Sequence, residues 1–304
     1  MSLDVPLSPA TLARIAGHHV VAAVSGGKDS TAMSLWLREA EIEHSRVFAD
    51  TGWEAPETYA YLDHLRERLG PIATVRNEAL WEGAQPGEGG MLHLIRRKQM
   101  FPSRTRRFCT EQLKLVPLKI HLQHLADAQP VINAVGIRSA ESVARRDMTE
   151  WEWNADFDCM VWRPLITWSE QDVIDIHARH GLRPNPLYLR GATRVGCYPC
   201  IYARKSEIAA LPASVVARLS PLEHELTADA VARGVERPER AFFHLHDPVN
   251  HASGFMPIER VREWARSTRG GRQLQLLDTA EPGCVRWGLC EHPAPIVKAL
   301  DGVA

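Results

Sequence analysis

The sequence has little that would place it in or across a membrane. None of its apolar runs approaches the roughly 20 residues that a membrane-spanning helix needs. The stretch Met1–Gly17 lacks the basic region and continuous apolar core of a secretion signal. Net charge is also nearly absent, since 36 basic and 37 acidic side chains leave −1, and no global field attracts nucleic acid or anionic lipid. The sequence favours a cytoplasmic protein with no membrane partner, and it does not indicate an oligomeric state.

Cysteine is sparse, with six residues among 304. A chain of this length does not need disulfides for stability, and the reducing cytoplasm disfavours them. Closely spaced cysteines are therefore better interpreted as metal ligands or redox groups. One such pair is present, Cys197 and Cys200. The pair is compatible with a redox-active motif, a zinc half-site or an iron–sulfur half-site, and its spacing alone does not decide among them.

The first half of the chain alternates short apolar runs with helical patterns. The strand-like runs cover residues 19–24, 46–50, 72–75 and 131–135, and the helical patterns cover 31–40, 56–69 and 114–126. Such alternation predicts an α/β domain, a parallel twisted sheet with helices on both faces in a Rossmann-like arrangement, over residues 1–168. The pattern beyond is mainly helical, so we expect residues 169–304 to form a helical C-terminal lobe that carries the Cys-x-x-Cys segment.

The first strand-like run ends in a short polar segment that opens a helical pattern. This segment consists of Ser25, Gly26, Gly27, Lys28, Asp29 and Ser30. Glycines let the backbone approach an anion closely, and amides at a helix N-terminus point at phosphate oxygens. Ser25 and Ser30 add hydroxyl donors, Lys28 adds a positive charge, and Asp29 is suited to hold magnesium or to cap the helix. We expect a phosphate-binding loop in which Lys28 and Asp29 also serve catalysis.

The loop resembles the PP-loop of the ATP pyrophosphatase and adenine nucleotide alpha-hydrolase superfamily. Within that superfamily, further segments resemble the phosphoadenylyl-sulfate (PAPS) reductase family. They are Phe48-Ala49-Asp50-Thr51-Gly52 with Pro56-Glu57-Thr58, Gly136-Ile137-Arg138-Ser139, Arg163-Pro164-Leu165, and Asn185-Pro186-Leu187-Tyr188 with Gly196-Cys197-Tyr198-Pro199-Cys200. The resemblance covers residues 18–205 and leaves the remaining third of the chain unmatched.

The resemblance implies an adenine nucleotide, either ATP or PAPS, bound with Mg²⁺. The loop would grip its phosphates. Asp50 and Thr51 would lie at a strand end near the adenosine, and Gly136 and Arg138 would form the opposite wall. An Asp at the carboxyl end of a parallel strand is where ligands bind in such sheets, although Asp is also common in turns. Arg138 could instead serve in a surface ion pair.

The resemblance also implies a [4Fe-4S] cluster. Cys109 occupies the place where cluster-containing adenylyl-sulfate reductases carry two adjacent cysteines, and here there is one. Together with Cys197 and Cys200 it would provide three ligands, and we expect Cys290 rather than Cys284 to supply the fourth. A zinc half-site or free thiols are the alternative. Cys159 lies in an apolar run, where a buried structural thiol is expected.

One departure bears on the activity. Assimilatory reductases of the family end in a Glu-Cys-Gly-(Leu or Ile)-His motif, and this sequence contains none; Cys290-Glu291-His292 lacks the glycine and the order. We therefore expect an enzyme that uses ATP to adenylate an acceptor for sulfur transfer, with a sulfur donor protein as a partner. The rivals are a PAPS or adenylyl-sulfate reductase that releases sulfite and a non-enzymatic nucleotide-sensing or docking protein.

A basic stretch precedes Cys109. Its cations are Arg96, Arg97, Lys98, Arg104, Arg106 and Arg107. Such a cluster suits a nucleic-acid backbone or substrate phosphates. A solvated helix face explains it equally well.

Overall fold

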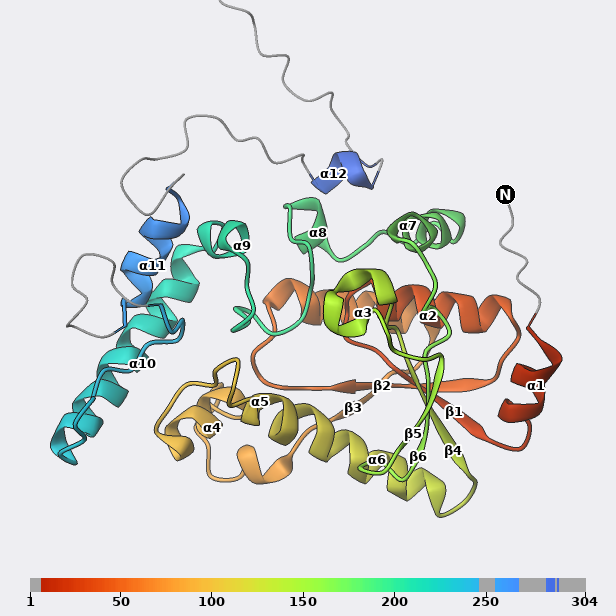
Figure 1. The fold of residues 1–304 in the computed structure, drawn as a ribbon, viewed down its shortest axis with the longest axis horizontal. Coiled ribbons are helices and arrows are strands. Elements are labelled where there is room, and N and C mark those ends of the chain that lie inside the picture. The colour runs from red at the N-terminus through yellow and green to blue at the C-terminus, as the bar shows by residue number, and fades with distance from the viewer. Residues whose placement is uncertain (1–6, 246–254, 268–282, 288, 290–304) are drawn as a thin grey trace, which may run out of the picture.

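The computed structural model describes residues 7–245, 255–267, 283–287 and 289 (Figure 1). At its centre is a six-stranded sheet with the order β3-β2-β1-β4-β6-β5. The strands are β1 (His19–Ala23), β2 (His44–Ala49), β3 (Ala73–Val75), β4 (Val131–Val135), β5 (Trp151–Asn154) and β6 (Cys159–Trp162). All neighbouring strands pair in parallel except β5, which is antiparallel to β6.

The central strand is apolar on both faces because helices cover both. Val20 and Ala22 of β1 belong to the core cluster on one side of the sheet, and Val21 belongs to the cluster on the other. Figure 1 shows α2 (Lys28–Glu39) and α3 (Pro56–Leu69) over one face and α6 (Val116–Ala126) over the other. Buried parallel strands have this near-continuous hydrophobic character. The predicted α/β fold is confirmed.

The α/β half also contains several short helical elements outside the main layers. They are α1 (Pro9–Ile15), α4 (Met91–Lys98), α5 (Phe108–Thr110), a π-helical segment (Glu111–Leu115), and the 3₁₀ turns Glu78–Leu80, Ser139–Glu141 and Val143–Arg145. The prediction for helix 56–69 is confirmed: Pro56 opens α3, and Gly70 ends it with φ +94°. The predicted helix over residues 114–126 is present, and its first two residues belong to the π-helical segment Glu111–Leu115 that leads into α6.

The edge strand β5 is a second difference from the sequence prediction, which contained no antiparallel strand. Asn154 and Cys159 are partners in the ladder, so the connection from β5 to β6 is a short turn. An antiparallel pair needs no crossover helix, and the strand–helix alternation therefore gives no indication of it. Cys159 is buried at the start of β6, as predicted.

The C-terminal part is mainly helical in its described residues. Its helices are α7 (Glu170–Arg179), α8 (Pro186–Leu189), α9 (Lys205–Ala209), α10 (Ala213–Ala232), α11 (Ile258–Ala265) and α12 (Gly283–Arg286). The division at residue 168 stays a prediction, and core contacts cross it. Val173 and Ile176 of α7 pack in the core of the α/β sheet, while Leu94 of α4 packs with α10 and α11.

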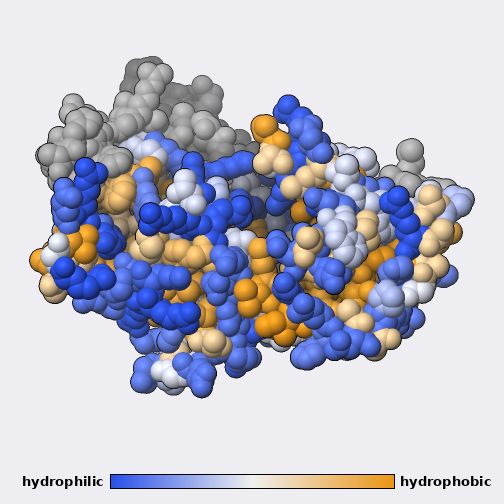
Figure 2. Space-filling model, turned by 60° about the horizontal axis from the view of Figure 1, so that its bottom comes forward, coloured by the Kyte–Doolittle hydropathy of each residue, from blue (hydrophilic) through white to orange (hydrophobic). Residues whose placement is uncertain are grey.

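The outer surface is mixed. Figure 2 brings the side of α4 to α6 forward, and hydrophilic side chains cover much of this face while apolar ones gather toward its lower centre. Ile120 of α6 is one of the exposed apolar residues of the molecule. Exposed apolar residues of this kind are ordinary on protein surfaces, and we assign no function to this face. No helix in the described ranges has the length and apolar character to cross a membrane.

Candidate functional site

The loop between β1 and α2 leaves the first amides of α2 available to an anion. Gly27 is the N-cap of α2 and has no side chain to cap these amides, although the first of them, that of Lys28, donates to the Tyr188 hydroxyl at 3.1 Å. Gly26 has φ +69°, and a Cβ atom there would lie 2.9 Å from the Thr58 side chain, which explains the glycine. The Ser30 hydroxyl accepts a hydrogen bond from the Ser25 amide at 3.1 Å. The loop is therefore held by its own polar groups in a shape suited to phosphate.

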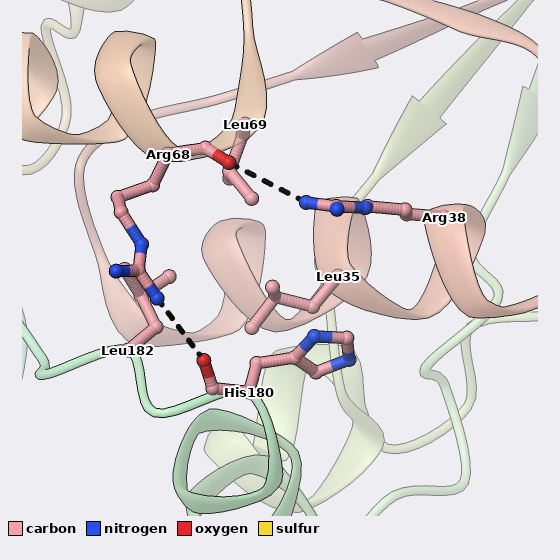
Figure 3. A pocket seen from close by; sticks show the side chains of 6 residues that line it. All are labelled: Leu35, Arg38, Arg68, Leu69, His180 and Leu182. Atoms are coloured by element: carbon pink, nitrogen blue, oxygen red, sulfur yellow. Dashed lines mark hydrogen bonds between the residues drawn. The ribbon is translucent and has the colours of Figure 1, made fainter.

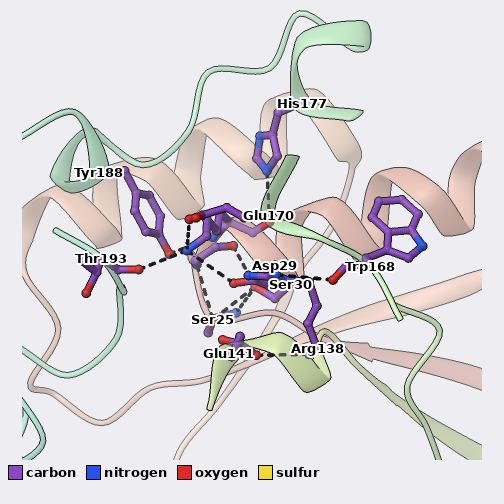
Figure 4. Close-up of polar contacts among 12 residues, drawn as sticks. Ser25, Asp29, Ser30, Arg138, Glu141, Trp168, Glu170, His177, Tyr188 and Thr193 are labelled. Atoms are coloured by element: carbon purple, nitrogen blue, oxygen red, sulfur yellow. Dashed lines mark hydrogen bonds and ion pairs between the residues drawn. The ribbon is translucent and has the colours of Figure 1, made fainter. Parts of the chain in front are cut away.

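Lys28 is positioned by residues from the C-terminal part (Figure 4). Its Nζ donates to the carbonyl oxygen of Thr193 at 3.1 Å and lies 3.4 Å from Glu170 Oε1. The ammonium also lies over the Tyr188 ring, 4.8 Å from its centroid, and the Lys28 amide donates to the Tyr188 hydroxyl at 3.1 Å. A bound phosphate would compete with the Glu170 carboxylate for the same charge, and 43% of the Glu170 side chain is exposed.

Asp29 and Arg138 form a buried ion pair across the end of the sheet. Arg138 Nε lies 2.5 Å from Asp29 Oδ1, and the two side chains are 5% and 12% exposed. Gly136 permits this approach, because a Cβ atom there would lie 2.7 Å from the Ser30 backbone nitrogen. Arg138 is thus no surface residue. Its predicted place beside the loop agrees with this geometry, while its contact with nucleotide and the magnesium role of Asp29 stay predictions.

Two further side chains brace the loop and were missed by sequence reasoning. His177 Nε2 lies 3.0 Å from the carbonyl oxygen of Lys28, and Asn185 Nδ2 donates to the carbonyl oxygen of Gly26 at 3.2 Å. Burial lowers the pKa of His177, which favours a neutral ring that donates one hydrogen bond. Trp287 packs edge-on against His177 at 5.3 Å. Asn-Pro at 185–186 marks a turn, but the sequence does not say which carbonyl the turn reaches.

Asp50 and Thr51 follow β2 at its carboxyl end, where the prediction placed them. Asp50 Oδ1 accepts hydrogen bonds from the Gly52 amide at 2.9 Å and the Tyr59 hydroxyl at 2.8 Å. Thr51 is buried, and its hydroxyl donates to Glu54 Oε1 at 2.7 Å. Part of the role of both side chains is thus to hold the turn, and their nearness to adenosine stays a prediction.

The Cys-x-x-Cys segment meets this edge of the sheet. Cys197 Sγ lies 3.9 Å from Thr51 Oγ1, and the backbones of Cys197 and Glu54 form an isolated antiparallel bridge. Burial raises the pKa of the Cys197 thiol to about 11, although the nearby Lys114 ammonium opposes this. Lys114 comes from the π-helical segment, a feature often found at functional sites. Neither Glu54 nor Lys114 is identifiable from the sequence, because both belong to the site only through the fold.

Three of the four predicted cluster ligands can be placed. Cys109, Cys197 and Cys200 are free thiols, and Cys109 lies close enough to Cys200 for their charges to interact. Cys290 falls outside the described residues. Within the ranges that the structure describes, no three His, Cys, Asp or Glu side chains gather as a metal would require. As the thiols lie, they do not form a ligand set, and we derive no chemical step through a cluster or through zinc.

The basic stretch before Cys109 does not act as one surface. Arg96 forms ion pairs with Glu88 and Glu225, each at 2.8 Å, which tie α4 to α10. Arg104 and Arg107 instead lie over the ring of Tyr202, 5.7 and 5.5 Å from its centroid. Only the second half of the stretch therefore faces the Cys-x-x-Cys segment.

A small cavity of about 220 Å³ lies at the far end of α2, away from the loop (Figure 3). Its cations are used to satisfy backbone carbonyls. Arg38 Nη1 donates to the carbonyl oxygen of Arg68 at 3.4 Å, and Arg68 Nη2 donates to that of His180 at 3.3 Å. These contacts join the ends of neighbouring helices, and the cavity is not part of the candidate site.

Comparison with known proteins agrees with this architecture. Residues 19–203 match the phosphoadenosine phosphosulfate reductase domain. An uncharacterized 37.8 kDa protein of Escherichia phage 186 is 35% identical over 89% of this chain and 96% of its own length. Phosphoadenosine 5'-phosphosulfate reductase of Alkalilimnicola ehrlichii is 30% identical over 61% of this chain and 71% of its own.

The fold has a counterpart among solved structures. Phosphoadenylyl-sulfate reductase of Candida auris, in its phosphate complex, has a TM-score of 0.50 at 14% identity, covering 64% of this chain and 91% of that one. A likeness at this identity concerns the fold alone. With the family match over residues 19–203, the chain belongs to the phosphoadenosine phosphosulfate reductase domain family.

Proposed function

We propose that this chain binds ATP at the loop Ser25–Ser30 and adenylates an acceptor that then receives sulfur. One observation carries the proposal: the Cys197 thiol lies 3.9 Å from the Thr51 hydroxyl, beside the sheet edge that bears the loop. A buried thiol thus adjoins the end of the sheet that is suited to nucleotide phosphates. A thiol beside a phosphate-binding loop suits an enzyme that transfers sulfur to a nucleotide-activated acceptor.

The loop residues would serve the first step. An acceptor oxygen attacks the α-phosphorus, a new oxygen–phosphorus bond forms, and the bond to the leaving pyrophosphate breaks. Lys28 and the open amides of α2 stabilise the charge that develops on pyrophosphate. Bound Mg²⁺, with Asp29 as its proposed ligand, would neutralise phosphate charge. Arg138 holds Asp29 in place through the ion pair described above.

Sulfur transfer would complete the reaction. Hydrosulfide, which the donor protein delivers without a covalent bond to it, attacks the adenylated centre of the acceptor and loses its proton to solvent. The acceptor–sulfur bond forms as the acceptor–oxygen bond breaks, and AMP leaves with that oxygen. No external oxidant or reductant enters this balance.

The rival reaction is reduction of PAPS or adenylyl-sulfate, favoured by the names of relatives such as the Alkalilimnicola protein. The missing Glu-Cys-Gly-Leu-His motif argues against it. Anaerobically purified protein incubated separately with ATP and with PAPS separates the two. The proposal expects AMP from ATP and no thioredoxin-dependent sulfite from PAPS. Sulfite release at about 1 s⁻¹ or faster, an ordinary enzymatic rate, would establish the reductase instead. Tight binding with no turnover of either nucleotide would support a sensor.

The iron–sulfur site is a further part of the proposal and rests on the family resemblance at Cys109, Cys197 and Cys200, because these thiols do not gather as a ligand set in the described part of the chain. Anaerobic protein should be brown and contain about four irons per chain, as a Cys₄-held [4Fe-4S] site requires. Cys197→Ser should abolish the colour, and Cys159→Ser, a matched change of a buried thiol in β6, should keep it. Stoichiometric zinc without iron would contradict this part while leaving the adenylation proposal intact.

A further inference from the structure

A second cavity lies on the other side of the Cys-x-x-Cys segment from the loop. It measures about 550 Å³, within the range of small-ligand sites. Its walls come from the end of the basic stretch, from the residues that follow Cys200, from residues 242–245 after α10, and from Trp264 of α11. Ile201, which lines it, is the direct neighbour of Cys200.

The lining combines aromatic and apolar side chains with positive charge, part of which is already engaged, since the Lys205 ammonium donates to the carbonyl oxygen of Ser267 at 2.6 Å and lies over the Trp264 ring. Phe242 and Phe243 are buried at the cavity, and Arg104, Arg204 and Lys205 supply cations. No acidic residue is among the described residues that line it. Arg104 and Arg204 are exposed and form no ion pair with any carboxylate that the structure describes. An apolar floor beside free guanidinium groups is complementary to a flat ring that carries a phosphate.

The helix α9 joins this cavity to the nucleotide loop. Lys205, at its start, lines the cavity, and Glu207 accepts a hydrogen bond from the Thr193 hydroxyl at 2.9 Å. The carbonyl oxygen of Thr193 in turn accepts a hydrogen bond from Lys28 Nζ at 3.1 Å. A helix of five residues spans only about 8 Å. A ligand in the cavity and a nucleotide on the loop would therefore be near neighbours.

We infer that this cavity binds the acceptor, and that the acceptor is a nucleotide unit, with its base against Phe243 and Trp264 and its phosphate at Arg104 and Arg204. Its identification as the acceptor site rests on the proposed function, while the binding itself does not. A free mononucleotide and one nucleotide of a single strand both present such a base and phosphate. Neither source needs the base pairs of a duplex, since a base enters the cavity only when it is unpaired.

The test is equilibrium binding to the full chain, followed by the anisotropy of a labelled ten-residue oligothymidylate and by competition with thymidine monophosphate. The double charge reversal Arg104→Glu with Arg204→Glu should weaken binding at least about tenfold, as loss of two phosphate contacts predicts. Arg237→Glu, an exposed arginine of the same lobe that does not line the cavity, should leave it unchanged. Lys28→Ala should also leave it unchanged, because that residue belongs to the loop.

The two ligands identify the source. If the oligonucleotide binds at least about tenfold more tightly than the monophosphate, as additional phosphate contacts predict, the natural ligand is a strand. If the two affinities are equal, the natural ligand is a free nucleotide. The inference is overturned if neither ligand binds at millimolar concentration. It is also overturned if the double charge reversal leaves binding unchanged, or if Arg237→Glu weakens binding as much as the double charge reversal does. Pyrophosphate release from ATP is measured separately in the wild-type protein. Its absence there would defeat the proposed function and leave the cavity result standing.

Discussion

Two buried carboxylates, one in each half of the molecule, are stabilised in different ways. Asp29, at the nucleotide loop, pairs with the buried guanidinium of Arg138 at 2.5 Å. Glu223 of α10, in the helical lobe, accepts hydrogen bonds from the Phe242 and Ile258 amides at 2.8 and 2.9 Å, and within the described part of the chain it has no cationic partner. Burial raises the pKa of Glu223 to about 7.

The difference separates a charged region from a neutral one. The loop keeps opposite charges fixed beside each other, which preserves an electrostatic environment for phosphate. The helical lobe uses its carboxyl group to join α10 to the amides of Phe242 and Ile258, and burial raises the pKa of this carboxyl group to about 7. Variants at each carboxylate should therefore fail in different ways.

Arg138→Ala should have the largest effect, because it removes the nearer cation of the buried Asp29 carboxylate and leaves only the Lys28 ammonium at 3.9 Å. Loss of one member of a buried ion pair costs about 3–5 kcal/mol in the free energy of unfolding. Urea denaturation followed by circular dichroism measures it. The double variant Arg138→Met with Asp29→Asn should recover much of the loss. If Arg138→Ala unfolds at the wild-type urea concentration, the buried pair does not contribute to stability.

Lys28→Ala should weaken ATP binding by about 1.5–3 kcal/mol, the value of one charge-assisted contact to phosphate. Isothermal titration calorimetry gives the affinity, and circular dichroism checks the fold. Arg38→Ala is a matched control, because it removes a cation at the other end of α2. Equal ATP affinity in the folded Lys28→Ala variant and the wild type would remove Lys28 from the site.

The smallest effect concerns pH. The folded-state pKa of Glu223, about 7, lies above the ordinary value of 4.5, so the folded protein binds a proton more tightly than the unfolded chain. Its contribution to stability is complete below pH 4.5 and is lost as the pH rises through 7. Between pH 6 and pH 8 the ionisation of Glu223 should lower the free energy of unfolding by about 1 kcal/mol.

Glu223→Gln does not titrate and isolates the contribution. Subtracting its pH profile of unfolding free energy from that of the wild type cancels the other titrating groups, including the histidines. The difference should decline from pH 6 to 8. A flat difference would mean that the carboxyl group is already ionised at pH 6, and the contrast with Asp29 would then fail.

The sequence predicts what depends on neighbouring residues. The loop follows from a hexapeptide, and α3 follows from Pro56 at its start and Gly70 after its end. Cys159 could be placed because an apolar run buries its own members. These features need no knowledge of the rest of the chain.

What the sequence cannot predict depends on long-range contacts. His177 meets Lys28 across 149 residues, and Lys114 of the π-helical segment lies near Cys197, a residue more than 80 positions later in the chain. The same holds for β5, whose Trp-Glu-Trp-Asn alternation is only four residues long and does not show that it pairs with β6 at the sheet edge. In each case the partner is fixed by the fold.

The most direct test of the central claim is which phosphorus–oxygen bond of ATP breaks. Anaerobic protein is incubated with ATP and acceptor-containing extract, and ³¹P nuclear magnetic resonance follows the products, with Lys28→Ala as the control. Attack at the α-phosphorus predicts pyrophosphate and AMP in equal amounts, both absent from the control. ADP and inorganic phosphate as the products would contradict the account, because they report cleavage at the γ-phosphorus.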